Sequence, residues 1–203
     1  MSDADPKDNG LRTRLIGKLE LLAGEHGQVS DVRMRLFPPP PPEVPESSLR
    51  TSLAGIANRP FCRSEKFVEQ QWRADRQDAH ADILLFEKLL VRRMRALDVP
   101  MFASTVWRTA DDQNSAYVRG TSKAKAGQSA HNWGCAVDII HGVKGWDLSK
   151  DQWAIIGHVG KELAVQNGLK LVWGGRDSPT DRFDWDPAHW ELANWRDHKI
   201  VRS

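Results

Sequence analysis

The sequence has few cysteines, a single tyrosine, no long apolar run and no excess of charge of either sign. Its 2 cysteines in 203 residues are too few for a disulfide framework, and nothing pairs them at metal-ligand spacing. The sequence contains no run of about 18 apolar residues, the length that a helix needs to span a bilayer. With 29 Lys and Arg against 27 Asp and Glu, the net charge of +2 lacks the clear basic excess of a nucleic-acid binder. These absences leave an ordinary globular protein.

Tryptophan is the residue present in unusual number. There are 9 tryptophans, and only Trp72 lies in the first hundred residues. Large rigid aromatic side chains are typical of cores and binding sites, so we expect the functional domain to be C-terminal. Five of them fall beside candidate site residues, and we expect several of these to wall the site: Trp107, Trp133, Trp173, Trp185 and Trp190.

The N-terminal part differs in composition from the rest. Five consecutive prolines at 38–42, followed by Pro45, form a stiff polyproline segment that cannot join a core. Before it, apolar residues at helical spacing from Leu11 to Leu22 predict one short helix in a polar arm. We therefore predict a flexible N-terminal extension over residues 1–48 and a single domain over residues 49–203.

The rest of the chain predicts an α+β fold. Apolar spacing and Ser64 predict a charged helical stretch that Pro100 ends, with its Lys and Arg residues on a solvated face. Ser149 is expected to cap a second helix that ends at Asn167-Gly168. Short β-like runs lie at 102–109, 135–140, 169–173 and 189–192. Strands without strict βαβ alternation predict a small antiparallel sheet flanked by helices.

Two histidines and an aspartate have the pattern of a metal site. If 135–140 is a strand, Asp138 shares a face with the small Ala136, and His131 lies just before that strand. His189 would complete a His, Asp, His set, which leaves the fourth zinc position open as in catalytic sites. A His–Asp pair at this spacing does not by itself make a site, and a hydrogen-bonded or surface role is the simpler interpretation of the other histidines.

Two further carboxylates flank His189. Asp186 lies three residues before it, across a turn that Pro187 helps to fix, and could act as general base and then proton donor. A turn-forming Asp before Pro is the plain alternative. Glu191 would share the strand face of His189, where it is the expected hydrogen-bond partner of that imidazole.

These segments resemble a known family. The chain matches S-x-H-x-x-G-x-A-x-D from Ser129 to Asp138, then W-G-G from Trp173, then D-x-x-H-[FW]-E from Asp186 to Glu191. This is similar to the zinc D-alanyl-D-alanine carboxypeptidase and L-alanyl-D-glutamate endopeptidase family of peptidoglycan peptidases, which includes bacteriophage endolysins. Upstream, Val106-Trp107-Arg108-Thr109 and the following Gln113 also resemble it. The resemblance covers about residues 80–200.

The resemblance implies a role for each matched residue. One catalytic Zn²⁺ would be bound by His131, Asp138 and His189. Asp186 would be the general base, with Asp184 as a rival at a spacing that fits the motif less well. Arg108 would stabilise the oxyanion or hold a substrate carboxylate. Ser129 and Gln113 would line the substrate site.

We therefore expect a zinc metallopeptidase that cleaves L-Ala–D-Glu in peptidoglycan as a phage or prophage endolysin. The Asp-Pro-Ala-His sequence and W-G-G favour this branch. The alternatives are a D,D-carboxypeptidase that removes terminal D-Ala and a non-catalytic zinc-fold module that binds cell wall. The N-terminus MSDADPKDNG shows no secretory signal. We accordingly expect a monomer made in the cytoplasm that reaches the wall through a separate membrane pore-former and binds no nucleic acid.

Overall fold

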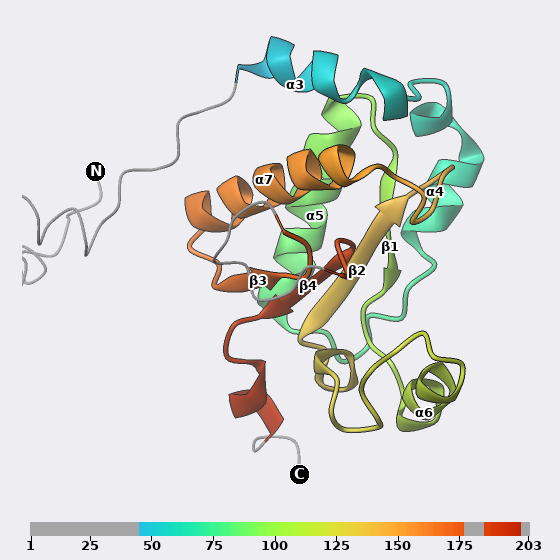
Figure 1. Cartoon of the computed structure of the whole chain (residues 1–203), viewed down its shortest axis with the longest axis vertical. Helices are drawn as coiled ribbons and strands as arrows, with labels where there is room; N and C mark the ends of the chain where they lie inside the picture. Colours follow the sequence, from blue (N-terminus) through green and yellow to red (C-terminus); the bar gives the residue numbers. More distant parts are fainter. Residues whose placement is uncertain (1–44, 177–184, 200–203) are drawn as a thin grey trace, which may run out of the picture. The chain divides into compact units, whose positions relative to one another are not determined.

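The structure is a computed structural model that describes residues 45–176 and 185–199 (Figure 1). The predicted N-terminal helix and polyproline segment lie outside these residues, so the extension and the boundary at residue 48 stay predictions. The first described helix, α3 (Glu46–Ser52), spans that boundary. Its Leu49 is buried in the same core as the residues that follow.

A four-stranded antiparallel sheet forms the centre of the domain, in the order β1-β2-β4-β3. The strands are β1 (Met101–Thr105), β2 (Ala136–His141), β3 (Leu171–Trp173) and β4 (His189–Leu192). With the helices around it, this sheet confirms the predicted α+β class. The register of β2 on β4 sets Asp138 directly opposite His189, and Ala136 opposite Glu191. Directly paired residues share a face, so all four side chains point the same way.

The other face of the sheet is covered by two long helices, α5 (Ala81–Ala96) and α7 (Lys150–Gln166) (Figure 1). Trp190 packs on Phe86 of α5 with ring centroids 4.6 Å apart, and it stacks on Trp173 at 5.9 Å. A side chain at Gly160 of α7 would overlap the Trp190 ring. Trp173 and Trp190 therefore belong to the core behind the sheet, and the expectation that they wall the site is wrong for these two.

The helices match the sequence prediction in part. Helix α7 begins with the predicted Ser149 cap, which forms a complete capping box with Gln152, and its C-cap is Asn167. The charged stretch after Ser64 is two helices, because α4 (Glu65–Gln71) ends nine residues before α5 starts at its His80 cap. Helix α6 (Ala110–Val118) was not predicted. Short 3-10 turns complete the domain: η1 (Ala54–Ile56), η2 (Phe61–Arg63), η3 (Ala130–Trp133) and η4 (Trp195–Lys199).

No helix in the part of the chain that the structure describes combines the length and apolar character needed to cross a membrane.

Candidate metal centre

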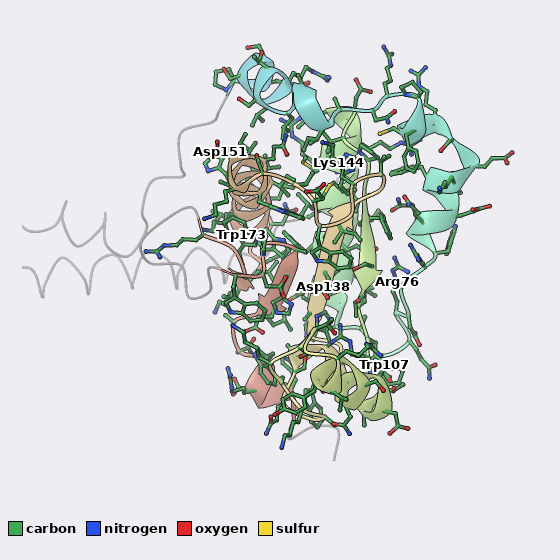
Figure 2. All side chains as sticks on the ribbon, turned by 45° about the vertical axis from the view of Figure 1, so that its right-hand side comes forward. Arg76, Trp107, Asp138, Lys144, Asp151 and Trp173 are labelled. Atoms are coloured by element: carbon green, nitrogen blue, oxygen red, sulfur yellow. The ribbon has the colours of Figure 1, made fainter. Side chains whose placement is uncertain are left out.

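Three side chains from two strands and a turn meet on the face of the sheet opposite α5 and α7. Nε2 of His131, Oδ1 of Asp138 and Nδ1 of His189 lie 3.0 to 3.2 Å from one another. Ligand atoms around a tetrahedral zinc ion at its usual bond lengths are roughly 3.3 Å apart. Figure 2 labels Asp138 near the middle of the domain, between Trp173 and Arg76. The geometry of this group fits a single small cation, and among the described residues it is the only such group of three donors.

The second nitrogen of each imidazole has an acceptor of its own. Nδ1–H of His131 donates to the carbonyl oxygen of Val106 at 2.9 Å. Nε2–H of His189 donates to Oε2 of Glu191 at 3.2 Å. A carbonyl or a carboxylate can only accept, so each bond places the ring proton away from the centre and leaves a lone pair directed into it. Both rings are thereby oriented as metal ligands need to be.

Trp195 of η4 extends the second of these bonds. Its Nε1–H donates to Oε1 of Glu191 at 3.1 Å, while the other oxygen of that carboxylate accepts from His189. Trp195 is 3% exposed and Glu191 6%. The indole therefore helps to fix the carboxylate that orients the imidazole. Strand alternation predicts the bond between Glu191 and His189. The bond between Trp195 and Glu191 could not be predicted, because it depends on the turn that follows β4.

The local backbone explains how His131 reaches Asp138. The Ser129 hydroxyl accepts a hydrogen bond from the backbone N–H of His131 and so caps η3. Gly134 then turns the chain into β2 with a positive φ of 63°. A Cβ atom at Gly134 would overlap the carbonyl oxygen of Asp78. This turn therefore requires glycine both for its backbone angle and for the close approach of a neighbouring segment.

The carboxylates and imidazoles of the centre shift one another's pKa values. Burial would raise the pKa of Asp138, but the two adjoining imidazoles outweigh burial and hold that pKa well below its usual range. Burial disfavours a charged His189, yet its hydrogen bonds to Asp138 and Glu191 raise its pKa to about 10. Both shifts follow from the close approach of the carboxylates and imidazoles at this centre. Two nitrogens, one carboxylate oxygen and a free fourth position suit Zn²⁺, so the donor set fits that ion.

Asp186 lies beside this centre. The backbone N–H of His189 donates to the Asp186 carbonyl at 3.0 Å, and the Asp186 N–H donates to the Gly174 carbonyl at 3.1 Å, so these bonds fix the backbone of the turn that carries Asp186. Gly174 has no room for a side chain, because a Cβ there would overlap the Asp186 carbonyl. Partial burial and the charge of Asp138 raise the pKa of Asp186. The rival Asp184 lies outside the described residues.

Arg108 approaches the centre from the end of β1. One terminal nitrogen lies 3.7 Å from Oδ2 of Asp138, and the other donates to Oε1 of Gln113 at 3.0 Å. Gln113 is fully buried, and its amide nitrogen donates to Ser122 and to the carbonyl of Ala124. Gln113 therefore links the guanidinium to the loop after α6. The predicted substrate contacts of Gln113 and Ser129 stay predictions.

No protein-family profile matches the sequence, and no curated protein is similar enough to count as a match. Among solved structures, the L-Ala D-Glu endopeptidase ChiX of Serratia marcescens is 24% identical, with coverage of 66% of this chain and 91% of that one and a TM-score of 0.48. A zinc complex of the vancomycin-resistance D,D-pentapeptidase VanY is 13% identical over 61% and 77%, with a TM-score of 0.40.

The LD-carboxypeptidase LdcB is a third similar structure. It is 17% identical over 61% of this chain and 63% of its own, with a TM-score of 0.37. All three proteins are named as peptidases, and the LdcB structure is described as revealing peptidoglycan recognition. At these identities the likeness concerns the fold, so the reaction of this chain has to be inferred from its own site.

Proposed function

We propose that this protein is a zinc-dependent peptidase that hydrolyses a peptide bond in the peptidoglycan stem, with L-Ala–D-Glu as the bond cleaved. The observation that carries the proposal is the convergence of His131, Asp138 and His189, with both outer ring nitrogens bonded away from the centre. The substrate is taken from the resemblance of the sequence motifs to the peptidoglycan peptidases.

The residues around the centre supply what amide hydrolysis needs. When bound, zinc would lower the pKa of a water molecule to about 7 and polarise the scissile carbonyl. Asp186 would take a proton from the attacking water and pass it to the leaving amine. Burial and the charge of Asp138 raise its pKa, which favours the step in which it returns a proton. Arg108 presents a charged fork that can hold the oxyanion or a substrate carboxylate.

Two substitutions separate the metal ligands from the base. Asp186→Ala should keep stoichiometric zinc but lose cell-wall hydrolysis by at least about a hundredfold, because general-base catalysis contributes that much or more. His131→Ala should lose both zinc and hydrolysis. Zinc content by atomic absorption and turbidity of purified cell walls measure the two effects. Asp147→Ala, which removes an exposed carboxylate elsewhere, is the matched control. Full activity of Asp186→Ala would refute the assignment of the base.

Mass spectrometry of digested muropeptides identifies the bond. Stems with a new N-terminal D-Glu support the endopeptidase, and released D-Ala supports the alternative D,D-carboxypeptidase. The same digestion with a chelator should give neither product. A protein that binds zinc and cell wall but never cleaves would instead be the non-catalytic binding module.

We further propose that the protein acts as a phage or prophage endolysin on the wall after the membrane is permeabilised. Expression in bacterial cells should then cause lysis only when a separate pore-former is co-expressed, and Asp186→Ala should abolish that lysis. Lysis without permeabilisation would contradict this proposal. Sedimentation analysis tests the expected monomer.

A further inference from the structure

A groove between α4 and α5 contains none of the residues of the metal centre. It encloses about 400 Å³, and Phe67, Leu84 and Val91 contribute its apolar surface. Arg76 is among its lining residues, and Figure 2 shows Arg76 and Trp173 on opposite sides of Asp138. The groove is therefore separate from the candidate metal centre.

Apolar side chains are exposed at and beside this groove. Trp72, which lines it, is 81% exposed, although tryptophan is one of the most costly side chains to leave in water. One helical turn earlier on α4, Val68 is 54% exposed, and Leu85 on α5 is 42% exposed. Trp72 thus leaves a large apolar side chain in water at the groove, where a bound partner could cover it.

The charges that line the groove are nearly all positive. Four cationic side chains, Arg76, Lys88, Arg92 and Arg95, face a single carboxylate. That carboxylate, Glu87, is already neutralised by Arg76 at 2.6 Å. Within the described ranges, no carboxylate lies at ion-pair distance from the other three cations. The guanidinium of Arg95 lies over the Phe67 ring, 5.5 Å from its centroid, which holds positive charge above the apolar surface.

We propose that this groove binds an acidic amphipathic segment of a partner protein, which inserts an apolar side chain beside Trp72 and sets carboxylates against Lys88 and Arg92. Charge complementarity selects the sign of the partner, since three cations that have no carboxylate partner among the described residues repel a basic one. The concave apolar surface between two helices suits an inserted side chain, as in helix-in-groove recognition, better than it suits a flat bilayer. Exposed Trp and Arg are the residue types that carry most binding energy at interfaces.

The test uses the zinc-loaded full chain and fluorescein-labelled peptides of about 18 residues, long enough for five helical turns. Three acidic peptides carry Leu, Phe or Trp at positions i, i+3 and i+7 with Glu on the flanks, and a fourth replaces each Glu by Lys. Fluorescence anisotropy measures binding. At least one acidic peptide should bind saturably, more weakly at high salt, and the basic peptide should not bind.

Groove variants locate the site. Trp72→Ala and the double variant Lys88→Glu/Arg92→Glu should each weaken peptide binding by about tenfold or more. The matched controls are Trp146→Ala, which removes another tryptophan that is 56% exposed, and Lys170→Glu, and neither should change binding. Circular dichroism verifies that each variant is folded. Chelation of zinc should leave peptide binding unchanged, which separates this proposal from the proposed function.

Several results would overturn the proposal. Failure of all three acidic peptides to bind would do so, as would equal binding by wild type and the double variant. Saturable binding of vesicles of anionic phospholipid in place of the peptides would assign the groove to a membrane surface. A dimer that Trp72→Ala dissociates would assign it to a second copy of the chain.

Discussion

His131 and His189 present opposite ring nitrogens to the same point, Nε2 from the first and Nδ1 from the second. The reason is the position of the acceptor that binds the outer ring nitrogen of each histidine. The carbonyl of Val106 is fixed in the backbone at the end of β1, so it accepts from Nδ1 of His131. Glu191 lies two residues after His189 on the same strand face, where it meets Nε2. Each tautomer is therefore set by a neighbour that the fold places.

Trp195 should affect the centre through Glu191. Trp195→Phe keeps a buried ring but removes the N–H that fixes the carboxylate, so we expect zinc to dissociate more readily, by up to about tenfold. Competition with a chromophoric chelator measures this. Trp153→Phe is the matched control, because it also removes an indole N–H from a buried ring, on α7. Equal losses of zinc affinity in both variants would mean that Trp195 acts only by packing.

At the scale of elements, the turn from η3 into β2 sets the position of His131 relative to Asp138. We expect Gly134→Ala to lower the free energy of unfolding by more than about 2 kcal/mol, since it adds overlap with the Asp78 backbone to the cost of a positive φ. Gly120→Ala isolates the second effect, because Gly120 has a φ of 74° but open space around it. Urea denaturation compares the two variants. Similar losses would contradict the role of the close approach.

His141 at the end of β2 should make stability depend on pH. Its Nε2–H donates to Ile56, and its Nδ1 accepts from the backbone N–H groups of Val143 and Lys144, which requires a neutral ring. Burial, with a smaller contribution from Lys144, lowers the pKa of His141 below its ordinary 6.5. The unfolded chain therefore binds this proton first as pH falls, so the stabilising contribution is complete above pH 6.5 and is lost below it.

Unfolding of the zinc-loaded protein at pH 7.5 and pH 5 measures the effect, at about 1.4 kcal/mol for each unit by which the pKa is lowered. His141→Gln carries no titrating charge there, so it should lose less stability over the same interval. An NMR titration in which His141 ionises at its ordinary pKa would contradict the argument.

The sequence predicted some elements better than others for physical reasons. Helix α7 has both apolar periodicity and strong caps, and its ends were predicted closely. Helix α6 buries only Gln113 and Ala116, so it has no apolar stripe to reveal it. The break between α4 and α5 depends on a tertiary contact, because the N–H of the His80 cap donates to the carbonyl of Gly134, 54 positions further along the chain. No local pattern encodes such a contact.

At the scale of the whole molecule, one face of the sheet packs against the helices and the other carries the candidate metal centre. Alternation along β4 sends Trp190 into the helices and His189 and Glu191 to the opposite face. The motif spacing therefore predicted the donor set, which the strand register brings together. Strand alternation does not predict the bonds from Val106 to His131 and from Trp195 to Glu191, because Val106 and Trp195 lie outside the strands.

Because the three donors come from η3, β2 and β4, a bound metal ties together segments that are 58 positions apart in sequence. Zinc that binds only the folded state stabilises it by mass action, by about 2.7 kcal/mol at a hundredfold excess over the dissociation constant. For a domain of this size, that corresponds to a rise in Tm of about 5 to 10 °C. Differential scanning fluorimetry with zinc and with a chelator measures the shift, and His131→Ala should abolish it. A Tm that is the same in both conditions would contradict metal binding at this centre, whatever the activity of the enzyme.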